Sequence, residues 1–499
     1  MNRLYYGDNL DVLRRHVDDE SVDLIYLDPP FNSNANYNVL FAERDGAQAA
    51  SQIKAFEDTW RWDEGAARAF EEVVEAGGRV SQAMQAFRTF MGDTDMLAYL
   101  AMMAPRLVEL RRVLKPTGSL YLHCDPTASH YLKLVLDAVF GPQQFRNEVI
   151  WKRTTAHSSA KKFAPVHDVI LYYAHSDKPT WNSPRTGYED AYLDKYYKFD
   201  DGDGRLYWRA DLCAAGVRHG KSGEPWRGID PGAKGMHWKF GVDTLDKLDA
   251  EGRIYWPPKG TMPQYKRYRE ELMGLAVSDL WDDIDRINPV GAERLGYPTQ
   301  KPEALLTRII EASSNEGDVV LDPFCGCGTA IAAAQKLKRQ WVGIDITHLA
   351  ITLIRSRLTD TFEGKASYRV VGEPVSQPDA EALAASDPYQ FQWWALGLVG
   401  ARPVEQKKGA DKGIDGRIYF HEGPGETKQI VLSVKAGKLH APYVRDLRGV
   451  VDREKAVIGV LLCLDEPTKA MRTEAASAGF YTSPWASIPG FRSSPSKTY

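Results

Sequence analysis

The stretch LIYLDPPFN, residues 24–32, places an acid, two prolines and an aromatic residue directly after an apolar run. The run Leu24–Leu27 predicts a buried strand that is ended by a chain breaker. Each proline removes a backbone donor and fixes φ, so Asp28–Phe31 is expected to form a stiff loop beyond the carboxyl end of that strand. In open α/β sheets ligands bind at this edge, although an ordinary proline turn would have the same local sequence.

The composition is typical of a soluble globular protein with room for two or three domains. The chain has 499 residues, a net charge of -4 and a hydrophobic fraction of 43%. This slight acidity argues against wholesale wrapping by nucleic acid but permits a local basic groove. The five cysteines show no metal-site or disulfide spacing, the start resembles no targeting peptide, and no apolar run would span a bilayer. We therefore expect a protein of the reducing cytoplasm.

Apolar patterning predicts an α/β fold for most of the chain. Residues 21–30, 118–126 and 166–175 are expected to form strands, and 95–114 an apolar-striped helix that is stopped by Lys115–Gly118. Such alternation of strands and helices is typical of a mostly parallel sheet with helices on both faces.

The domain boundaries follow from changes in this pattern. Residues 1–370 are predicted to form the main domain, with 181–295 as an insertion rich in Gly, Trp, Tyr and charge. Residues 371–385 are expected to be a linker, and 386–490 a smaller α/β unit. A strand–helix pattern that resumes near residue 300 places both halves of the main domain in one sheet.

A second strand-to-helix turn has the features of a cofactor loop. The segment VVLDPFCGCGTAIAAAQ places Asp322 at the end of a predicted strand and Gly326 and Gly328 before a predicted helix. Glycines let the backbone turn sharply and approach a ligand at the helix N-terminus. Asp345 ends the next predicted strand, about 20 residues on, where an acid can bind ribose hydroxyls. The loop lacks the lysine of a P-loop, and its acid and aromatic residue suit a cationic, purine-bearing cofactor better than a phosphate.

Four segments together resemble the DNA amino-methyltransferases of the permuted β class, in which the catalytic motif precedes the cofactor motif. They are YYGDNLDVL (5–13), LDPPFN (27–32), YPTQKPEALL (297–306) and LDPFCGCGT (321–329). Their order and spacing cover roughly the first 370 residues. The resemblance implies a Rossmann-like, S-adenosylmethionine-dependent fold, with both motifs at neighbouring strand ends.

The resemblance implies a specific chemistry for the catalytic tetrapeptide. An exocyclic base amine is a poor nucleophile because its lone pair is delocalised into the ring. The Asp28 carboxylate and the carbonyl of Pro29, which Pro30 stiffens, would accept hydrogen bonds from this amine and stabilise its developing positive charge. Phe31 would stack on a base swung out of the duplex. Aspartate at this position favours adenine N6 over cytosine N4, where the family more often has serine.

The resemblance also implies which residues line the cofactor pocket. The loop side consists of Asp322, Phe324, Gly326, Gly328 and Asp345. The adenine and methionine ends would be completed by Asp8, Thr299, Gln300 and Lys301. For Lys301, an exposed lysine at a helix start is an equally good interpretation. Cys325 and Cys327 are interpreted as small packing residues.

A basic segment and the insertion are the candidate contacts with double-stranded DNA. The segment WKRTTAHSSAKKF carries four cations and no acid, namely Lys152, Arg153, Lys161 and Lys162. It could track a phosphate backbone or be a solvated loop. His167 and Asp168 open the next predicted strand, where a structural hydrogen bond explains them as well as catalysis does. The insertion is the natural target-recognition region.

The last domain resembles the PD-(D/E)xK nuclease core, especially Mrr-like restriction endonucleases. Two predicted strands place Asp415 on the first, and Ser433 and Lys435 on the second. In that family a second acid or Gln stands where this chain has Ser433, and the pair holds Mg²⁺. A hydroxyl is a weak ligand for this cation, so Asp415 is the only candidate metal ligand and cleavage is in question. Alternatively, Asp415 and Lys435 form a surface pair on a plain α/β module.

Three functions compete on these grounds. The first is a site-specific DNA methyltransferase that carries a nuclease-like domain. The second is a single-chain restriction-modification enzyme that also cleaves DNA. The third is a non-enzymatic DNA-binding regulator on a methylase scaffold, which the intact catalytic tetrapeptide and cofactor loop disfavour. A homodimer is a further assembly that the sequence allows.

Overall fold

The structure is a computed structural model, in which two compact units are distinguished, residues 1–182 with 279–499 and residues 183–278. It describes residues 2–30, 62–156, 163–258, 262–288, 293–295, 297, 299–403, 413–423, 426–482, 487–489 and 491–495.

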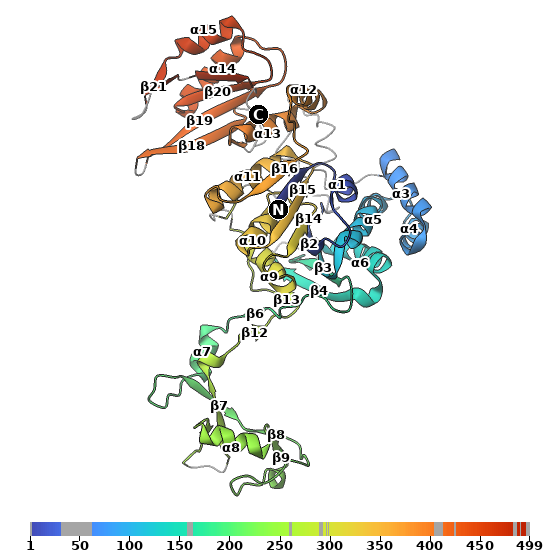
Figure 1. The fold of residues 1–499 in the computed structure, drawn as a ribbon, viewed down its shortest axis with the longest axis vertical. Coiled ribbons are helices and arrows are strands. Elements are labelled where there is room, and N and C mark those ends of the chain that lie inside the picture. The colour runs from blue at the N-terminus through green and yellow to red at the C-terminus, as the bar shows by residue number, and fades with distance from the viewer. Residues whose placement is uncertain are drawn as a thin grey trace. The chain divides into compact units, whose positions relative to one another are not determined.

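A nine-stranded sheet forms the centre of the larger unit, in the part of the chain that the structure describes (Figure 1). Its strand order is β13-β4-β5-β3-β2-β14-β15-β1-β16. The strands are β1 (Asn2–Tyr6), β2 (Val22–Leu27), β3 (Leu114–Cys124), β4 (Phe145–Lys152), β5 (His167–Ala174), β13 (Leu280–Trp281), β14 (Val319–Asp322), β15 (Gln340–Asp345) and β16 (Tyr368–Val371).

The sheet is mixed, and β5 is the strand that departs from the expected parallel arrangement. Among the described strands, β5 runs antiparallel to both β3 and β4, whereas the other pairings are parallel. A parallel neighbour would require a crossover connection, usually a helix. Instead, β5 returns beside β4 in the opposite direction, and an antiparallel pair of this kind needs no crossover.

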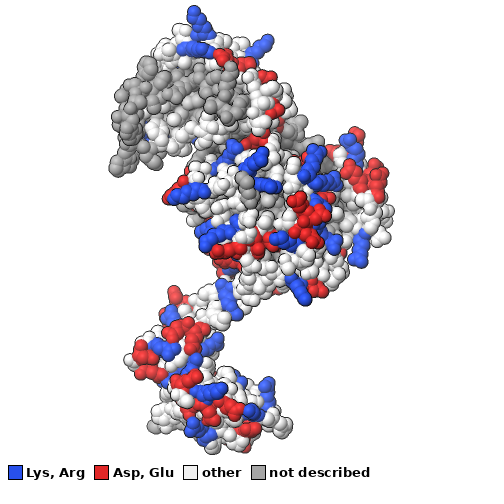
Figure 2. Space-filling model, viewed as in Figure 1, with Lys and Arg blue, Asp and Glu red and all other residues white. Residues whose placement is uncertain are grey.

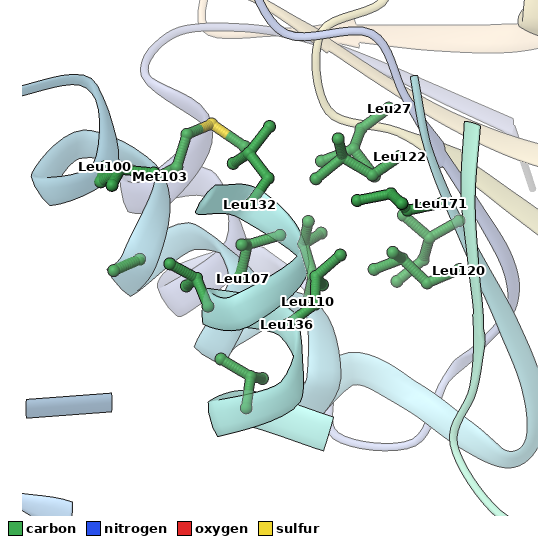
Figure 3. Close-up of a cluster of buried hydrophobic side chains, with 14 of the residues drawn as sticks. Leu27, Leu100, Met103, Leu107, Leu110, Leu120, Leu122, Leu132, Leu136 and Leu171 are labelled. Atoms are coloured by element: carbon green, nitrogen blue, oxygen red, sulfur yellow. The ribbon is translucent and has the colours of Figure 1, made fainter. Parts of the chain in front are cut away.

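Helices cover both faces of this sheet, as the sequence predicts. One face packs against helices whose leucines and methionines meet strand residues such as Leu27, Leu120 and Leu171 (Figure 3). These helices are α1 (Asn9–His16), α3 (Glu64–Ala76), α4 (Gly78–Met91), α5 (Asp95–Val113) and α6 (Pro126–Phe140). The other face carries α9 (Glu303–Ser313), α10 (Thr329–Lys336) and α11 (His348–Phe362), which contact β2, β14 and β15 respectively (Figure 1).

The helix predicted over 95–114 is α5, and its ends have clear local causes. The Thr94 hydroxyl accepts a hydrogen bond from the Leu97 amide at 3.3 Å, which caps the first turn. The helix ends at Val113, but the predicted breaker Lys115–Gly118 lies within β3 and not in a separate loop. The register of β3 against β2 shifts there, so the Pro and Gly are accommodated as a bulge.

The insertion forms its own compact unit, which is narrower than the predicted 181–295. It spans Ser183–Ser278, because Leu280 and Trp281 pair with β4 as part of the main sheet. Its core contains Leu212, Trp226 and Trp238. Its elements are β6 (Arg185–Thr186), α7 (Asp190–Tyr196), β7 (Tyr207–Asp211), β8 (Cys213–Ala215), β9 (Met236–Trp238), α8 (Val242–Ala250), β10 (Ile254–Tyr255), β11 (Gln264–Tyr268) and β12 (Leu275–Ala276).

Among its described residues, the C-terminal module contains a five-stranded sheet with the order β17-β18-β19-β20-β23. The two predicted strands are present as β18 (Gly416–Gly423) and β19 (Glu426–Lys435), which pair antiparallel. Strand β20 (Ile458–Cys463) runs parallel to β19. Its other elements are α12 (Gln377–Ser386), α13 (Pro388–Leu398), β17 (Arg402–Pro403), α14 (Pro442–Glu454), α15 (Lys469–Ser477), β21 (Phe480–Thr482), β22 (Ser487–Pro489) and β23 (Phe491–Pro495).

The predicted linker 371–385 is for the most part helix α12, and this is a correction. The small residues Ala380 and Ala384 are buried in one cluster with Trp394 and Leu432, so α12 belongs to the core of the C-terminal module. An Ala-rich segment has high helix propensity. The apolar face of α12 shares this cluster with Leu432, which is distant in the sequence, so the local sequence does not indicate this packing.

Helix α13 is packed against α11 of the main sheet. Trp393 and Leu349 form a buried cluster, and the Thr352 hydroxyl donates to the Trp393 carbonyl at 3.2 Å. A Cβ on Gly397 would lie 2.7 Å from the Thr352 hydroxyl oxygen, so glycine permits this close approach. In the described part of the chain, none of the helices is long and apolar enough to cross a membrane.

Candidate active site

The two proline-containing motifs lie side by side at one edge of the main sheet. Strand β2 pairs in parallel with β14, with Ile25 opposite Leu321 and Leu24 opposite Val320. The segments that follow them, Asp28–Pro30 and the loop after Asp322, therefore leave the sheet at the same carboxyl edge. This arrangement brings the predicted catalytic and cofactor loops together although a long stretch of chain separates them.

Asp28 is held by an ion pair that the sequence does not predict. The Lys301 ammonium contacts the Asp28 Oδ2 atom, and their side chains are 12% and 15% exposed, respectively. Lys301 also lies 3.5 Å from the Thr299 carbonyl, just before α9. Lys301 is thus a largely buried partner of the Asp28 loop and not an exposed lysine at a helix start.

Asp345 is fixed by hydrogen bonds from two sides. Its Oδ2 atom accepts from the Gly326 amide, and its Oδ1 atom accepts from the amide and the hydroxyl of Thr347, each at 2.9 Å. Burial raises the pKa of Asp345 to about 6, against the opposing effect of these hydrogen bonds. The carboxyl group therefore has a defined orientation at the end of β15.

Asp322 is buried in the same region, with its Oδ1 atom accepting from the Phe324 amide at 3.1 Å. Burial raises the pKa of Asp322 well above its usual range, and the charges of Asp28 and Asp345 raise it further. Three carboxyl groups and the single ammonium of Lys301 thus influence one another here. Such a surplus of acid favours a cationic ligand.

The glycine loop is shaped by close contacts at two positions. Gly326 and Gly328 have φ values of 49° and 74°, in the left-handed region. A Cβ would lie 3.1 Å from the Tyr297 ring at Gly326, and 2.6 Å from the Ile354 side chain at Gly328. The predicted packing residues Cys325 and Cys327 are buried, and burial raises the pKa of both thiols, so neither is an activated nucleophile. Tyr297 is a loop contact that the sequence interpretation did not single out, although it opens the YPTQKP segment.

The remaining predicted cofactor residues have mainly structural contacts. Asp8 caps α1 by accepting from the Leu10 amide at 2.9 Å, and its other oxygen pairs with Arg106 at 2.6 Å. The neighbouring Asn9 donates to the Pro323 carbonyl at 2.8 Å, which ties this segment to the cofactor loop. The Gln300 side chain donates to the Glu293 carbonyl at 2.7 Å.

The predicted DNA-binding residues are placed in part. Lys152 ends β4 at the surface, and Arg153 follows it with its Nε atom 3.0 Å from the Asp168 Oδ1 atom. Phe31, Lys161 and Lys162 lie outside the described residues.

The nuclease-like residues gather at the start of β18 and the end of β19. Asp415 directly precedes β18, is buried, and accepts from the Val434 amide at 2.6 Å. Ser433 is also buried, and the Lys435 ammonium lies 5.5 Å from the centre of the Tyr443 ring. Within the described residues, no group of three or more His, Cys, Asp or Glu side chains could hold a metal ion.

Comparisons with known proteins agree with this geometry. Residues 22–356 match the family N6_N4_Mtase, described as DNA methylase, and residues 389–483 match NACHT-associated inactive Restriction Endonuclease 1. The Type II methyltransferase M.EcaI of Enterobacter cloacae is 31% identical over an alignment that covers 71% of this chain and 69% of that protein.

More distant relatives include the Mod subunit of the Type III restriction-modification enzyme StyLTI of Salmonella typhimurium. It is 26% identical, and the alignment covers 77% of this chain and 57% of that subunit. Among solved structures, the putative DNA modification methylase TTHA0409 of Thermus thermophilus, complexed with S-adenosyl-L-methionine, is 15% identical with a TM-score of 0.37. That alignment covers 75% of this chain and 100% of that one. From its match over residues 22–356, the chain belongs to the N6_N4_Mtase family of DNA methylases, which use S-adenosylmethionine as the methyl donor.

Proposed function

We propose that this protein transfers a methyl group from S-adenosylmethionine to an exocyclic amine of a base in double-stranded DNA, with adenine N6 as the first choice and cytosine N4 as the second. The observation that carries this proposal is the direct parallel pairing of β2 with β14. It puts Asp28 and Pro29 beside the glycine loop that follows Asp322. The order of these motifs along the chain is that of the permuted class.

The residues at this edge fit the proposed donor. The buried carboxyl groups of Asp322 and Asp345 suit a sulfonium cation and ribose hydroxyls. Gly326 and Gly328 let the loop turn in the left-handed region against Tyr297 and Ile354. When bound, S-adenosylmethionine supplies an electrophilic methyl group. Asp345 would accept from the ribose, and Phe324 with the segment Thr299–Lys301 would close the pocket.

The chain's own residues prepare the acceptor amine. The Asp28 carboxylate and the Pro29 carbonyl accept its two N–H hydrogens, which draws the nitrogen toward tetrahedral geometry and stabilises its developing charge. Lys301 holds the Oδ2 atom of Asp28, so the Oδ1 atom is the one presented to the amine. The stiff Pro29–Pro30 backbone keeps this acceptor pair in place, and Phe31 would stack on the extruded base.

DNA contact is assigned to two regions. The basic segment that starts at Lys152 and Arg153 would bind phosphates, and the unit Ser183–Ser278 would read the target sequence. Lys and Arg are interspersed with Asp and Glu over the described surface in the view of Figure 2, as the net charge of -4 leads one to expect. Local cationic segments therefore matter more than the total charge.

Mass spectrometry of nucleosides tests the proposal directly. Unmethylated plasmid DNA is incubated with the protein and isotope-labelled S-adenosylmethionine, and the digested nucleosides are analysed. Labelled N6-methyladenine is the expected product, and N4-methylcytosine would keep the reaction class but change the base. Unlabelled DNA, despite measurable cofactor binding, would favour the regulator instead.

For the C-terminal module we propose DNA binding without efficient cleavage. Hydrolysis of a phosphodiester by this kind of core needs a firmly held Mg²⁺, and Ser433 offers a neutral hydroxyl where a second acid is required. The match to a family described as inactive supports the same proposal. Lys435, Lys438, Arg445 and Arg448 offer phosphate contacts.

The wild-type protein is therefore expected to leave plasmid DNA uncut in Mg²⁺ or Mn²⁺ while methylating it. Ser433→Glu should strengthen Mg²⁺ binding in calorimetry, because it adds a carboxylate at the end of β19 near Asp415. Ser477→Glu, which adds the same charge at an exposed position of α15, is the matched control. Rapid wild-type cleavage that Asp415→Ala and Lys435→Ala both eliminate would establish a restriction-modification enzyme instead.

A further inference from the structure

A series of polar side chains, here called the polar relay, crosses the sheet beside the Asp28 loop. It consists of the buried residues Tyr26, His123 and Asp168, together with Arg153. The Tyr26 hydroxyl of β2 lies 3.0 Å from the His123 Nδ1 atom of β3. The His123 Nε2 atom lies 3.2 Å from the Asp168 Oδ2 atom of β5. The Asp168 Oδ1 atom is 3.0 Å from the Nε atom of Arg153, directly after β4. These contacts thus connect three strands of the main sheet, β2, β3 and β5, with the residue that follows β4.

Burial makes these contacts costly unless every member has a partner. Tyr26, His123 and Asp168 are 2%, 0% and 4% exposed. Burial raises the pKa of Tyr26 well above its usual range, so its hydroxyl stays protonated and can donate to His123. Burial alone would raise the pKa of Asp168, but the His123 hydrogen bond and the charges of Arg153 and Lys301 lower it overall. A protonated Nε2 of His123 therefore satisfies both contacts of its ring.

The Tyr26 end of the polar relay lies next to the proposed catalytic loop. Tyr26 stands two positions before Asp28, at the end of a strand whose next residues are rigid prolines. The contact of the Tyr26 hydroxyl with His123 therefore anchors β2 two positions before the Asp28 carboxylate. The Lys301 charge acts at both places, since it pairs with Asp28 and lowers the pKa of Asp168.

The other end reaches the surface. The Arg153 side chain is 47% exposed, while the Asp168 side chain that holds its Nε atom is 5% exposed. Arg153 forms an ion pair with Asp168 at this position. The N–H donors of its guanidinium fork suit a phosphate oxygen, and the ion pair holds the fork directly after β4.

We propose that Tyr26, His123 and Asp168 are positioning residues that transmit a DNA-phosphate contact at Arg153 to the end of β2, and so set the orientation of Asp28. This inference rests on the proposed function, in that it assumes DNA as the substrate. None of the three buried residues touches the reacting atoms. They act by holding the loop in the geometry that the target amine requires.

The first test compares two tyrosines that face each other in the β2–β3 register. Tyr26→Phe and Tyr121→Phe each remove one buried hydroxyl. The Tyr121 hydroxyl contacts Ser313 at 2.7 Å and does not belong to the polar relay. With tritiated S-adenosylmethionine and saturating unmethylated plasmid DNA, Tyr26→Phe should lower the methyl-transfer rate by about 10- to 100-fold, the scale for a misplaced catalytic group. Its cofactor affinity should be unchanged, and Tyr121→Phe should retain the wild-type rate.

The second test asks whether Arg153 acts through the same polar relay. Arg153→Gln should raise the KM for DNA, reduce the salt dependence of binding by about one phosphate contact, and lower the rate at saturation. In the double variant, Arg153→Gln should cause no further loss of rate at saturation beyond that of Tyr26→Phe, because Tyr26→Phe has already interrupted the polar relay. If Tyr26→Phe does not fold, Asp168→Asn replaces it in both tests.

The outcomes separate this inference from the proposed function. A wild-type rate for Tyr26→Phe, an equal loss for Tyr121→Phe, or rate losses that multiply in the double variant would each overturn the polar relay while methylation itself stands. A wild-type protein that methylates no DNA would instead overturn the proposed function, and the inference with it.

Discussion

Asp28→Ala is expected to abolish DNA methylation while leaving cofactor affinity nearly unchanged. In the proposed reaction the Asp28 carboxylate is the charged acceptor for the target amine, and losing one such preorganised group costs about 100- to 1000-fold in rate. The sulfonium donor would instead be held by the neighbouring loop after β14. Methyl incorporation from labelled S-adenosylmethionine and calorimetry of cofactor binding measure the two effects separately.

Asp18→Ala is the matched control for this variant. Asp18 is exposed and lies before the start of β2, whereas Asp28 follows its end, so both changes remove one carboxylate from the same strand's flanks. Because Asp28→Ala also removes the partner of Lys301, a thermal melt checks that the fold persists. Normal turnover in Asp28→Ala would remove Asp28 from the catalytic step.

Asp345→Ala is expected to weaken S-adenosylmethionine binding by about 1–3 kcal/mol, the cost of leaving hydroxyl donors without a charged acceptor. Asp345 is held by Gly326 and Thr347, so its carboxyl group also shapes the glycine loop that would meet the cofactor. Calorimetry measures the loss. Asp318→Ala, at the opposite end of the neighbouring strand β14, should bind the cofactor as tightly as the wild type.

The pH dependence of cofactor binding gives an independent check on Asp345. Its pKa of about 6 means that lowering the pH from 7 to 5 protonates the free carboxyl group. A protonated carboxyl is the poorer acceptor for ribose hydroxyls, so affinity should fall with pH across this range. Asp345→Asn should remove this dependence. Equal wild-type affinity at pH 7 and pH 5 would contradict a role for the ionised carboxylate.

Much of the fold was predictable because its signals are local. The run Leu24–Leu27 with its prolines, the turn around Gly326 and Gly328, and the helix Asp95–Val113 each carry their own pattern of burial, stiffness or capping. Steric limits on proline and glycine act over a few residues, so no tertiary information is needed to place them. The membership of the chain in the DNA methylase family follows from four such segments in order.

Other features depended on parts of the chain that are distant in sequence. Lys301 and Asp28 are 273 positions apart in the sequence. Their ion pair contradicts the alternative that Lys301 is an exposed lysine at the start of a helix. Helix α12 was interpreted as a linker because its apolar face is short and its partner Leu432 lies in a distant strand. The reversal of β5 likewise follows from its pairing with β4, which no local pattern specifies.

The sequence by itself determined the local elements and the two loop motifs, since each rests on backbone sterics and short-range apolar periodicity. The family follows instead from the resemblance of the sequence motifs and from the match over residues 22–356. Only the tertiary structure decided which side chains meet. Tyr26, His123, Asp168 and Arg153 come from separate segments, and nothing in the sequence of any one segment indicates that these side chains meet. They form one series of contacts because sheet pairing brings their strands together and because each buried polar group requires a hydrogen-bond partner.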